Sequence, residues 1–259
     1  MQNDQPIGLF DSGIGGTSIW KEINRLLPNE DTIYLADSRN APYGQRPKNE
    51  ILELSEKNVE FLLERNCKII VVACNTATTN AISELRVKYK IPFVGIEPAI
   101  KPAVLESRTN AIGVLATKGT LSSELFSKAV ETYRDTRIIE QVGFNLVALI
   151  ESGRMESDEM SRLLHEYMKP MIEGNIDYLV LGCSHYPYLI PQIRRILPPH
   201  VQIIDSGSAV ARQTQTILQT LSGVADKDRI GKSVFYTNSD PAVLSEILGP
   251  GFNIQVADF

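Results

Sequence analysis

The sequence is poor in cysteine and histidine, and this scarcity limits the chemistry that the chain can perform. Among 259 residues there are three cysteines and three histidines. No Cys-X-X-Cys pair is present and no Cys/His spacing resembles a zinc site, so we expect neither a redox dithiol nor a bound metal. Three cysteines cannot all pair, and a reducing compartment would keep them as free thiols: Cys67, Cys74 and Cys183.

Long apolar runs and an excess of positive charge are also missing. No stretch approaches the ~20 apolar residues of a membrane-spanning helix, and residues 1–6 lack the basic and apolar segments of a secretory signal. The formal net charge of −5 and the pI near 5.4 argue against nucleic acid as a partner. These absences predict a cytoplasmic protein that partners neither a membrane nor a nucleic acid.

The sequence does contain a regular alternation of short apolar runs with amphipathic stretches. The runs predict strands at 6–11, 31–36, 68–73, 92–96, 110–115, 137–141, 177–182, 201–205, 232–236 and 253–257. The stretches predict helices at 16–27, 48–65, 77–88, 119–133, 157–172, 187–196, 207–221 and 240–248. Strand–helix alternation of this kind is typical of parallel sheets covered by helices on both faces. We therefore expect an α/β fold.

One stretch of the chain occurs twice in similar form. Residues 68–79 read KIIVVACNTATT and residues 178–189 read YLVLGCSHYPYL, each with an apolar run that ends at a cysteine. An Ile-Gly pair also recurs, in IGLF at 7–10 and in IGVL at 112–115. The two pairs are separated by nearly the same length of chain as the two cysteines. This repetition predicts two pseudosymmetric halves, each contributing one cysteine to a shared cleft.

The crossovers between the two halves are expected where polar turn residues interrupt the pattern. Candidate positions lie near Glu97-Pro98 and near Asp205-Ser206-Gly207. The first domain would then comprise residues 1–97 and 207–259, and the second domain residues 98–206. Each domain would be a mainly parallel sheet flanked by helices, with the active site between them.

Cys74 and Cys183 would each lie at the carboxyl end of a parallel strand, where α/β sheets bind their ligands. Asn75 and Thr76 are helix-capping residue types. Backbone N–H groups at the start of the following helix should therefore face the Cys74 thiol and favour its thiolate. Free cysteine more often simply packs in a core. We assign that role to Cys67, which precedes its strand and is not followed by polar residues of this kind.

Two opposed thiols without an evident cofactor suit the inversion of a carbon stereocentre. A base removes the α-proton from one face, an acid delivers a proton to the other, and the reverse reaction exchanges their roles. Free cysteine has a pKa of about 8.5, so holding it as thiolate at pH 7 costs roughly 2 kcal/mol. Asp11 is a candidate to assist Cys74, and His185 is a candidate to assist Cys183, which it follows by two residues.

Two loops that follow the first two predicted strands are further candidates for the cleft. Residues 13–16 (GIGG) lack the GxGxxG spacing of a dinucleotide-binding loop, and a tight strand-to-helix turn explains them equally well. Asp11 and Ser12 end the first strand, and we expect them to point into the cleft. The polar loop at 37–44 has an irregular backbone fixed by proline and glycine, and its Tyr43 is a candidate to lie over a ligand.

Five motifs together resemble the glutamate racemase family: FDSGIGG at 10–16, ADSRNAPYG at 36–44, ACNTAT at 73–78, IGVLAT at 112–117 and LGCSHYP at 181–187. Their order and spacing hold over essentially the whole chain. The resemblance implies an isomerase of the aspartate/glutamate racemase family that needs no cofactor. Its substrate would be glutamate, whose L and D forms it would interconvert for peptidoglycan synthesis. Dimers are common in this family, so the resemblance also allows a homodimer.

The resemblance assigns roles to particular residues by their position in these motifs. Cys74 and Cys183 look like the two catalytic acid/base residues, with Asp11, Glu151 and His185 as auxiliary acid/base residues. The substrate-binding residues implied in this way form four adjacent pairs: Asp11-Ser12, Tyr43-Gly44, Asn75-Thr76 and Ser184-His185. The family usually has threonine where this chain has Ser184, which keeps the hydroxyl and loses a methyl group.

Three alternatives remain open on the sequence alone. A racemase of another small acid or amide, such as aspartate or a hydantoin, would use the same scaffold with a side-chain pocket of different size. A cysteine hydrolase or amidotransferase would use Cys183 as nucleophile and His185 as its base, leaving Cys74 idle. A non-catalytic amino-acid-binding protein would leave the duplicated cysteine unexplained.

Overall fold

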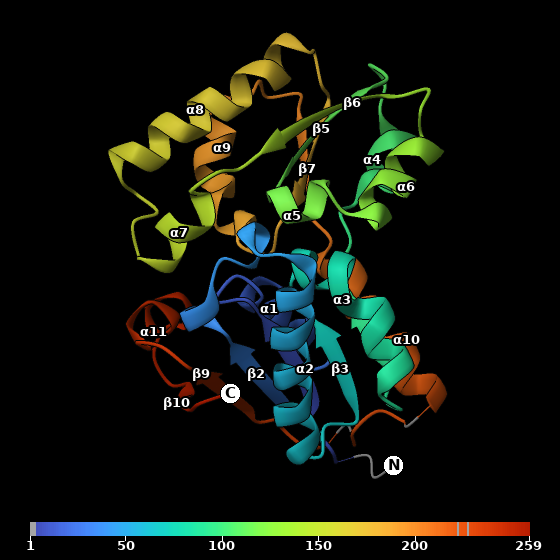
Figure 1. Ribbon diagram of the computed structural model, residues 1–259, viewed down its shortest axis with the longest axis vertical. Coiled ribbons are helices and arrows are strands. Elements are labelled where there is room, and N and C mark those ends of the chain that lie inside the picture. Colours follow the sequence, from blue (N-terminus) through green and yellow to red (C-terminus); the bar gives the residue numbers. More distant parts are fainter. Residues whose placement is uncertain (1–3, 222, 227) are drawn as a thin grey trace.

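The strands form two separate sheets in the computed structural model, which describes residues 4–221, 223–226 and 228–259 (Figure 1). The first sheet contains β1 (Ile7–Asp11), β2 (Thr32–Ala36), β3 (Ile69–Val72), β4 (Phe93–Gly95), β9 (Ser233–Thr237) and β10 (Asn253–Val256). The second sheet contains β5 (Ala111–Ala116), β6 (Arg137–Val142), β7 (Tyr178–Gly182) and β8 (Gln202–Ile204). Every predicted strand is confirmed, with ends that differ by no more than one residue.

The two sheets share one strand order, which confirms the predicted pseudosymmetric α/β fold. The first sheet runs β10-β9-β2-β1-β3-β4 and the second runs β6-β5-β7-β8, with all paired strands parallel. The order β2-β1-β3-β4 therefore matches β6-β5-β7-β8 strand for strand. Strands β3 and β7 occupy equivalent central places, so the cysteines that follow them are equivalent too.

Helices cover both sheets, as the buried strands require (Figure 1). The α-helices are α1 (Thr17–Leu26), α2 (Lys48–Glu64), α3 (Asn75–Lys88), α4 (Ile100–Glu106), α5 (Lys118–Leu121), α6 (Glu124–Thr132), α7 (Leu146–Glu151), α8 (Asp158–Glu173), α9 (Ile190–Ile196), α10 (Gly207–Leu221) and α11 (Ala242–Leu248). Short 3₁₀ helices are η1 (Ser38–Asn40), η2 (Tyr43–Gln45) and η3 (Tyr186–Leu189).

The continuous apolar runs form strands that are buried on both faces. All residues of β1, β3 and β5 are buried. Along β3, Ile69 and Val71 belong to one hydrophobic cluster while Ile70 and Val72 belong to another, because successive strand residues point to opposite faces. Alternation of polar and apolar residues is absent from such strands for this reason.

The helices differ from the prediction at four places. The helix predicted at 187–196 begins as the 3₁₀ helix η3 and is α-helical only over α9. The helix predicted at 119–133 is interrupted, because the Ser123 side chain accepts a hydrogen bond from the Phe126 backbone and begins α6 as a separate helix. Helices α4 and α7 were not predicted. They have seven and six residues, too few for the helical period to repeat often enough to stand out in the sequence.

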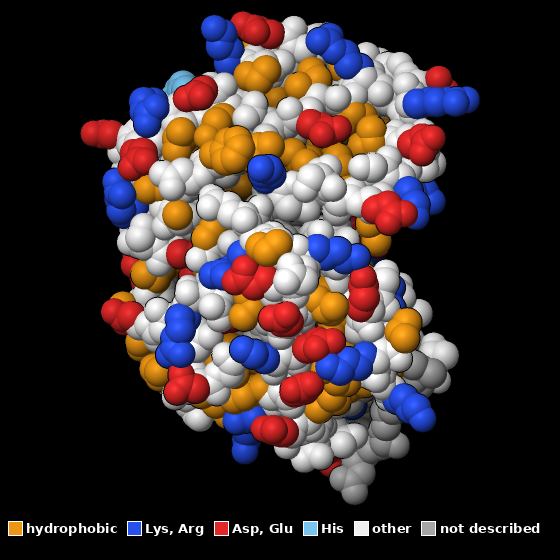
Figure 2. Space-filling model, viewed as in Figure 1, with side chains coloured by type: hydrophobic (Ala, Val, Ile, Leu, Met, Phe, Trp, Pro, Cys, Tyr) orange, Lys and Arg blue, Asp and Glu red, His pale blue; other side chains and the backbone are white. Residues whose placement is uncertain are grey.

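The two sheets lie in two lobes, and the molecule narrows where the lobes meet (Figure 2). The largest hydrophobic cluster nevertheless includes side chains from both lobes, for example Ile19 of α1 and Leu149 of α7. The predicted domain boundaries stay a prediction, although the strands on either side of each boundary do belong to different sheets. Among the described residues, no helix combines the length and the apolar character needed to cross a membrane.

Candidate active site

Cys74 and Cys183 line the same cavity, which lies where the carboxyl ends of β3 and β7 face each other. Both side chains are buried, with 4% and 5% of each residue exposed. The space between the lining side chains is small, ≈ 230 Å³ including the part that is open to solvent. The two sulfurs therefore face a common small space.

Cys74 is itself the residue that caps α3. Its Sγ accepts a hydrogen bond from the Ala77 backbone N–H at 3.5 Å and lies 3.7 Å from the Ser12 Oγ. Asn75 and Thr76 are the first helical residues, so the expectation that they cap this helix was wrong. The Ala77 N–H at the helix start does face the sulfur, as predicted. Burial and the nearby Asp11 carboxyl nevertheless raise the pKa of Cys74 well above its usual value, which keeps it a thiol.

Asp11 connects the surroundings of the two cysteines. Its Oδ2 accepts the Gly16 backbone N–H at 2.7 Å, and the Ser184 Oγ from the other lobe lies 3.2 Å from the same oxygen. Burial raises the pKa of Asp11, against the lowering effects of His185 and of the Gly16 N–H. Asp11 lies behind the cavity lining, so any contact between Asp11 and a ligand stays a prediction.

Cys183 stands beside a histidine that a carboxylate orients. The Cys183 Sγ lies 3.8 Å from Nδ1 of His185, and Nε2 of that ring lies 2.6 Å from Oε1 of Glu151. Nδ1 faces the sulfur, while Nε2 lies near two groups, the Glu151 carboxylate at 2.6 Å and the Gly15 backbone N–H at 3.3 Å. A carboxylate only accepts hydrogen bonds, so the shorter of these contacts favours a proton on Nε2. Burial alone would lower the pKa of His185, but the hydrogen bonds to Cys183 and Glu151 and the charge of Asp11 raise that pKa well above its usual value.

The GIGG loop makes room for two side chains of the opposite lobe. A Cβ atom on Gly13 would lie 2.0 Å from Oε1 of Glu151, and one on Gly15 would lie 2.2 Å from Nδ1 of His185. The Ile14 backbone N–H, between these glycines, donates to Oε1 of Glu151 at 2.7 Å. The glycines are thus required for close approach of the two lobes, a reason that neither a nucleotide-binding loop nor a simple turn would give.

We predict that Gly15→Ala lowers kcat/KM by about 100-fold, because the added methyl group displaces the imidazole by roughly 1 Å or more. The measurement is steady-state kinetics of the purified variant beside its melting temperature. Gly251→Ala is the control, because a Cβ there meets no heavy atom within 4 Å. Its φ of +95° will cost some stability, but we expect no loss of activity. Unchanged kinetics in Gly15→Ala would show that the position of His185 is unimportant.

Most of the other predicted residues also line the cavity. The lining residues include Ser12, Tyr43, Gly44, Asn75, Thr76, Ser184 and His185. Three further residues line the cavity: Pro42, Thr117 and Val147. The first two belong to motifs quoted above but were not assigned to the site, and only Val147 had no signal in the sequence. The Thr117 Oγ1 lies 2.9 Å from the Thr76 Oγ1, which closes one side of the cavity by a contact between the lobes. Glu151, like Asp11, lies behind the lining.

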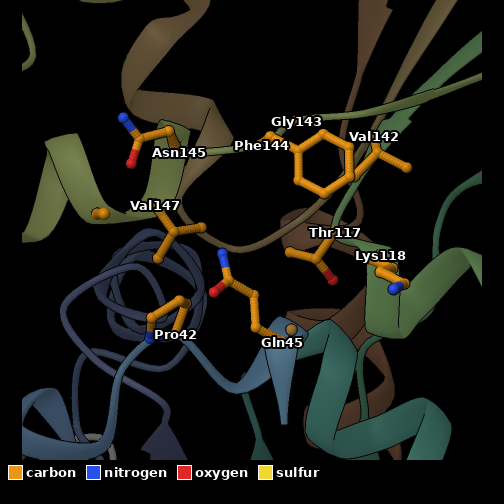
Figure 3. Close-up of a pocket in the computed structure, with 11 residues that line it drawn as sticks. Pro42, Gln45, Thr117, Lys118, Val142, Gly143, Phe144, Asn145 and Val147 are labelled. Atoms are coloured by element: carbon orange, nitrogen blue, oxygen red, sulfur yellow. The ribbon is translucent and has the colours of Figure 1, made fainter.

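A second pocket forms a vestibule outside this cavity (Figure 3). The two spaces share four lining residues: Pro42, Gly44, Thr117 and Val147. Figure 3 shows Phe144 and Val142 on the side of the second lobe, opposite Pro42 and Gln45 of the first. Phe144 is half exposed, and two tyrosine hydroxyls hold the backbone beside it, since Tyr167 donates to its carbonyl at 3.0 Å and Tyr186 to that of Gly143 at 3.2 Å. The vestibule therefore adjoins the cavity, and hydrogen bonds fix the backbone of its wall at Gly143 and Phe144.

The described residues contain no group of three or more His, Cys, Asp or Glu side chains that could hold a metal ion. The two thiols and the imidazole that line the cavity are groups that can transfer protons. Cys74 can act as an acid, because its pKa is raised. The Cys183 Sγ lies 3.8 Å from Nδ1 of His185, so the imidazole is placed to exchange a proton with this sulfur.

Comparison with known proteins identifies relatives over nearly the whole chain. Residues 7–214 match the Asp/Glu/Hydantoin racemase family. A glutamate racemase of Herpetosiphon aurantiacus is 43% identical over 245 residues, which cover 94% of this chain and 96% of that protein. The crystal structure of a glutamate racemase isoform from Bacillus anthracis has a TM-score of 0.89 at 31% identity, covering 99% and 98% of the two chains. The Escherichia coli glutamate racemase in complex with L-glutamate and the activator UDP-MurNAc-Ala has a TM-score of 0.86 at 31% identity, covering 97% of each chain.

Proposed function

Because this chain belongs to the Asp/Glu/hydantoin racemase family, we propose that it is a glutamate racemase that works by a two-base mechanism. The observation that carries the proposal is the pair of cysteines at equivalent strand ends of two similar sheets, both lining one small cavity. Two identical acid/base groups related by pseudosymmetry suit a substrate whose two forms are mirror images. No cofactor takes part in the proposed reaction.

In the proposed reaction one cysteine breaks a Cα–H bond and the other makes a new one on the opposite face. With one enantiomer bound, the thiolate of Cys183 takes the α-proton and becomes a thiol, and the electron pair remains on Cα. The thiol of Cys74 then gives its proton to the other face of Cα and becomes a thiolate. The reverse reaction exchanges the two roles. One sulfur gains a proton and the other loses one, so the total number of protons on the two sulfurs is unchanged after each turnover.

The unequal surroundings of the cysteines support a defined resting state. Burial and Asp11 hold Cys74 as a thiol, whereas Cys183 lies 3.8 Å from His185, whose raised pKa favours an imidazolium beside that sulfur. The resting enzyme would thus be in the protonation state that one enantiomer requires. The other enantiomer would react only after a proton has moved from the Cys74 sulfur to the Cys183 sulfur. Asp11, Glu151 and His185 act as auxiliary acid/base residues in this scheme because they set the charges around the two sulfurs.

The lining of the cavity supports an amino acid with two carboxylates as substrate. The first turn of α3 presents free N–H groups, and hydroxyl and amide side chains are nearby, an arrangement that favours carboxylates. These polar side chains are those of Ser12, Asn75, Thr76, Thr117 and Ser184. Tyr43 and Gly44 form part of the wall opposite the second lobe.

One observation also favours a cysteine hydrolase. Cys183, His185 and Glu151 stand in the order nucleophile, base and orienting carboxylate that such enzymes use. A hydrolase would need only this one cysteine, and the equivalent Cys74 in the same cavity would have no role. We rank racemisation first for that reason.

The experiment that tests this proposal is incubation with L-glutamate in D₂O without added cofactor. We expect D-glutamate to form with deuterium at Cα, while the remaining L-glutamate stays largely unlabelled at early times. A hydrolase would leave Cα unlabelled. Formation of labelled D-aspartate from L-aspartate, with no reaction of glutamate, would instead support the racemase of another small acid. Absence of exchange with both substrates would contradict the proposal.

Three further expectations belong to this proposal. The D-glutamate would supply peptidoglycan synthesis, the enzyme would act in the cytoplasm, and the chain would form a homodimer. Sedimentation of the purified protein tests the last of these.

A further inference from the structure

We propose that Ser38 is a positioning residue for the Cys183 half of the reaction, because it holds the Glu151 carboxylate in the orientation that His185 requires. The inference rests on the proposed function, which gives Cys183 and His185 their roles. Ser38 lies in η1, directly after β2, and it does not line the cavity. Its effect on the reaction is therefore indirect.

The two oxygens of Glu151 have different partners. Oε1 accepts hydrogen bonds from the His185 ring at 2.6 Å and from the Ile14 backbone at 2.7 Å. Oε2 accepts the Ser38 hydroxyl at 2.8 Å. The Glu151 side chain is only 12% exposed, so a lost partner is not freely replaced by water. Without the Ser38 hydroxyl, the carboxylate would be fixed at one oxygen only and could turn about its last bond.

The segment that carries Ser38 is itself rigid. The neighbouring Asp37 is buried, and its carboxylate accepts hydrogen bonds from Asn40 at 2.8 Å and from the side chains of Tyr43 and Asn238. The Arg39 backbone N–H donates to the side chain of Asn238 at 3.0 Å. The first lobe thus presents the Ser38 hydroxyl from a fixed position, while Glu151 comes from the second lobe. The contact is complete only when the lobes are together.

The groups that face His185 show in which direction its pKa should change when the Ser38 hydroxyl is removed. Glu151 comes from α7, Asp11 from β1, with its Oδ2 at 3.9 Å from Nδ1, and Cys183 follows β7. Of these, Glu151 is the group whose hydrogen bond to the ring depends on Ser38. A less well-aligned Glu151 stabilises the imidazolium less, so the thiolate of Cys183 also becomes less stable. The surroundings of Cys74 do not include Ser38 or Glu151 among their hydrogen bonds.

The test compares Ser38→Ala with Ser38→Thr, which keeps the hydroxyl, and with Ser107→Ala. Ser107 is a matched control, because it is half-buried and donates to the Asp177 carboxylate at 2.7 Å, before β7 at the far end of the second sheet. The first readout is the rate of alkylation of Cys183 by iodoacetamide as a function of pH, followed by peptide mass spectrometry. Cys74 in the same samples is the internal reference.

In Ser38→Ala we expect the Cys183 rate at pH 7 to fall about tenfold relative to that of Cys74, the order expected for a lost hydrogen bond to a charged group. The basic limb of the kcat/KM profile should move to lower pH, because the pKa of His185 falls. Ser38→Thr should restore both, and Ser107→Ala should change neither. An unchanged Cys183-to-Cys74 ratio in Ser38→Ala, or an equal change in Ser107→Ala, would overturn the inference.

The alkylation readout does not involve the substrate, so it separates the two proposals. A selective effect of Ser38 on Cys183 in a protein that exchanges no glutamate proton would refute the proposed function and support the positioning role. Exchange of glutamate with no effect of Ser38 on Cys183 would support the function and refute the positioning role.

Discussion

Replacing either Cys74 or Cys183 by serine is expected to lower kcat for racemisation by about 10³-fold, the order expected when an acid or base is removed from a proton-transfer step. A serine hydroxyl holds its proton far more tightly than a thiol. It is therefore not ionised to the form that could take the α-proton, and it is too weak an acid to give a proton to Cα. Because both enantiomers have the same free energy, kcat/KM must fall equally in the two directions. Optical rotation from each pure enantiomer measures both.

Cys67→Ser is the matched control for these two variants. Cys67 is also buried, but it belongs to the hydrophobic core of the first lobe, and burial raises its pKa to about 12. We expect its replacement to leave kcat unchanged. Substantial activity in either Cys74→Ser or Cys183→Ser would show that the two-thiol mechanism is wrong, whatever the substrate. A deep loss in only one of them would favour chemistry that uses a single cysteine.

The fold could be predicted from the sequence because its central strands have a strong sequence signal. Runs such as IIVV at 69–72 are buried on both faces, so each strand is marked by continuous apolar residues between polar turns. Short helices gave no comparable signal. Helix α7 spans only Leu146–Glu151 and begins after Asn145, whose φ of 65° depends on its surroundings in the folded chain.

The candidate site could be predicted only in part, for a related reason. Cys74 and Cys183 were marked by a pattern that occurs twice, and each follows a strand end. The contact of Ser38 with Glu151 joins residues 113 positions apart on different lobes, and no local pattern encodes it. The same is true of the fit of Gly13 against Glu151. Such contacts depend on how the lobes pack, which periodicity within one element does not describe.

Replacing Lys68 by Met is expected to destabilise the protein by about 3–5 kcal/mol, the cost of removing one member of a buried ion pair and leaving the charge of the other uncompensated. Lys68 Nζ lies 2.6 Å from Oε2 of Glu30, and the two side chains are 0% and 1% exposed. Oε1 of Glu30 also accepts the Ala225 backbone N–H at 2.7 Å. Without the ammonium group, Glu30 would be a buried charge against the amino-terminal side of the first sheet. A fall of roughly 10 °C in the melting temperature should follow.

The double variant Lys68→Met with Glu30→Gln distinguishes this explanation from a simple loss of packing. Glutamine keeps an acceptor for the Ala225 N–H and removes the charge, so the double variant should recover most of the lost stability. Lys128→Met is the control, because Lys128 Nζ also lies 2.6 Å from a carboxylate, that of Glu124, but on the surface. Exposed pairs contribute little, so its melting temperature should hardly change. If the double variant is as unstable as Lys68→Met alone, the apolar stem of the lysine, and not its charge, stabilises this region.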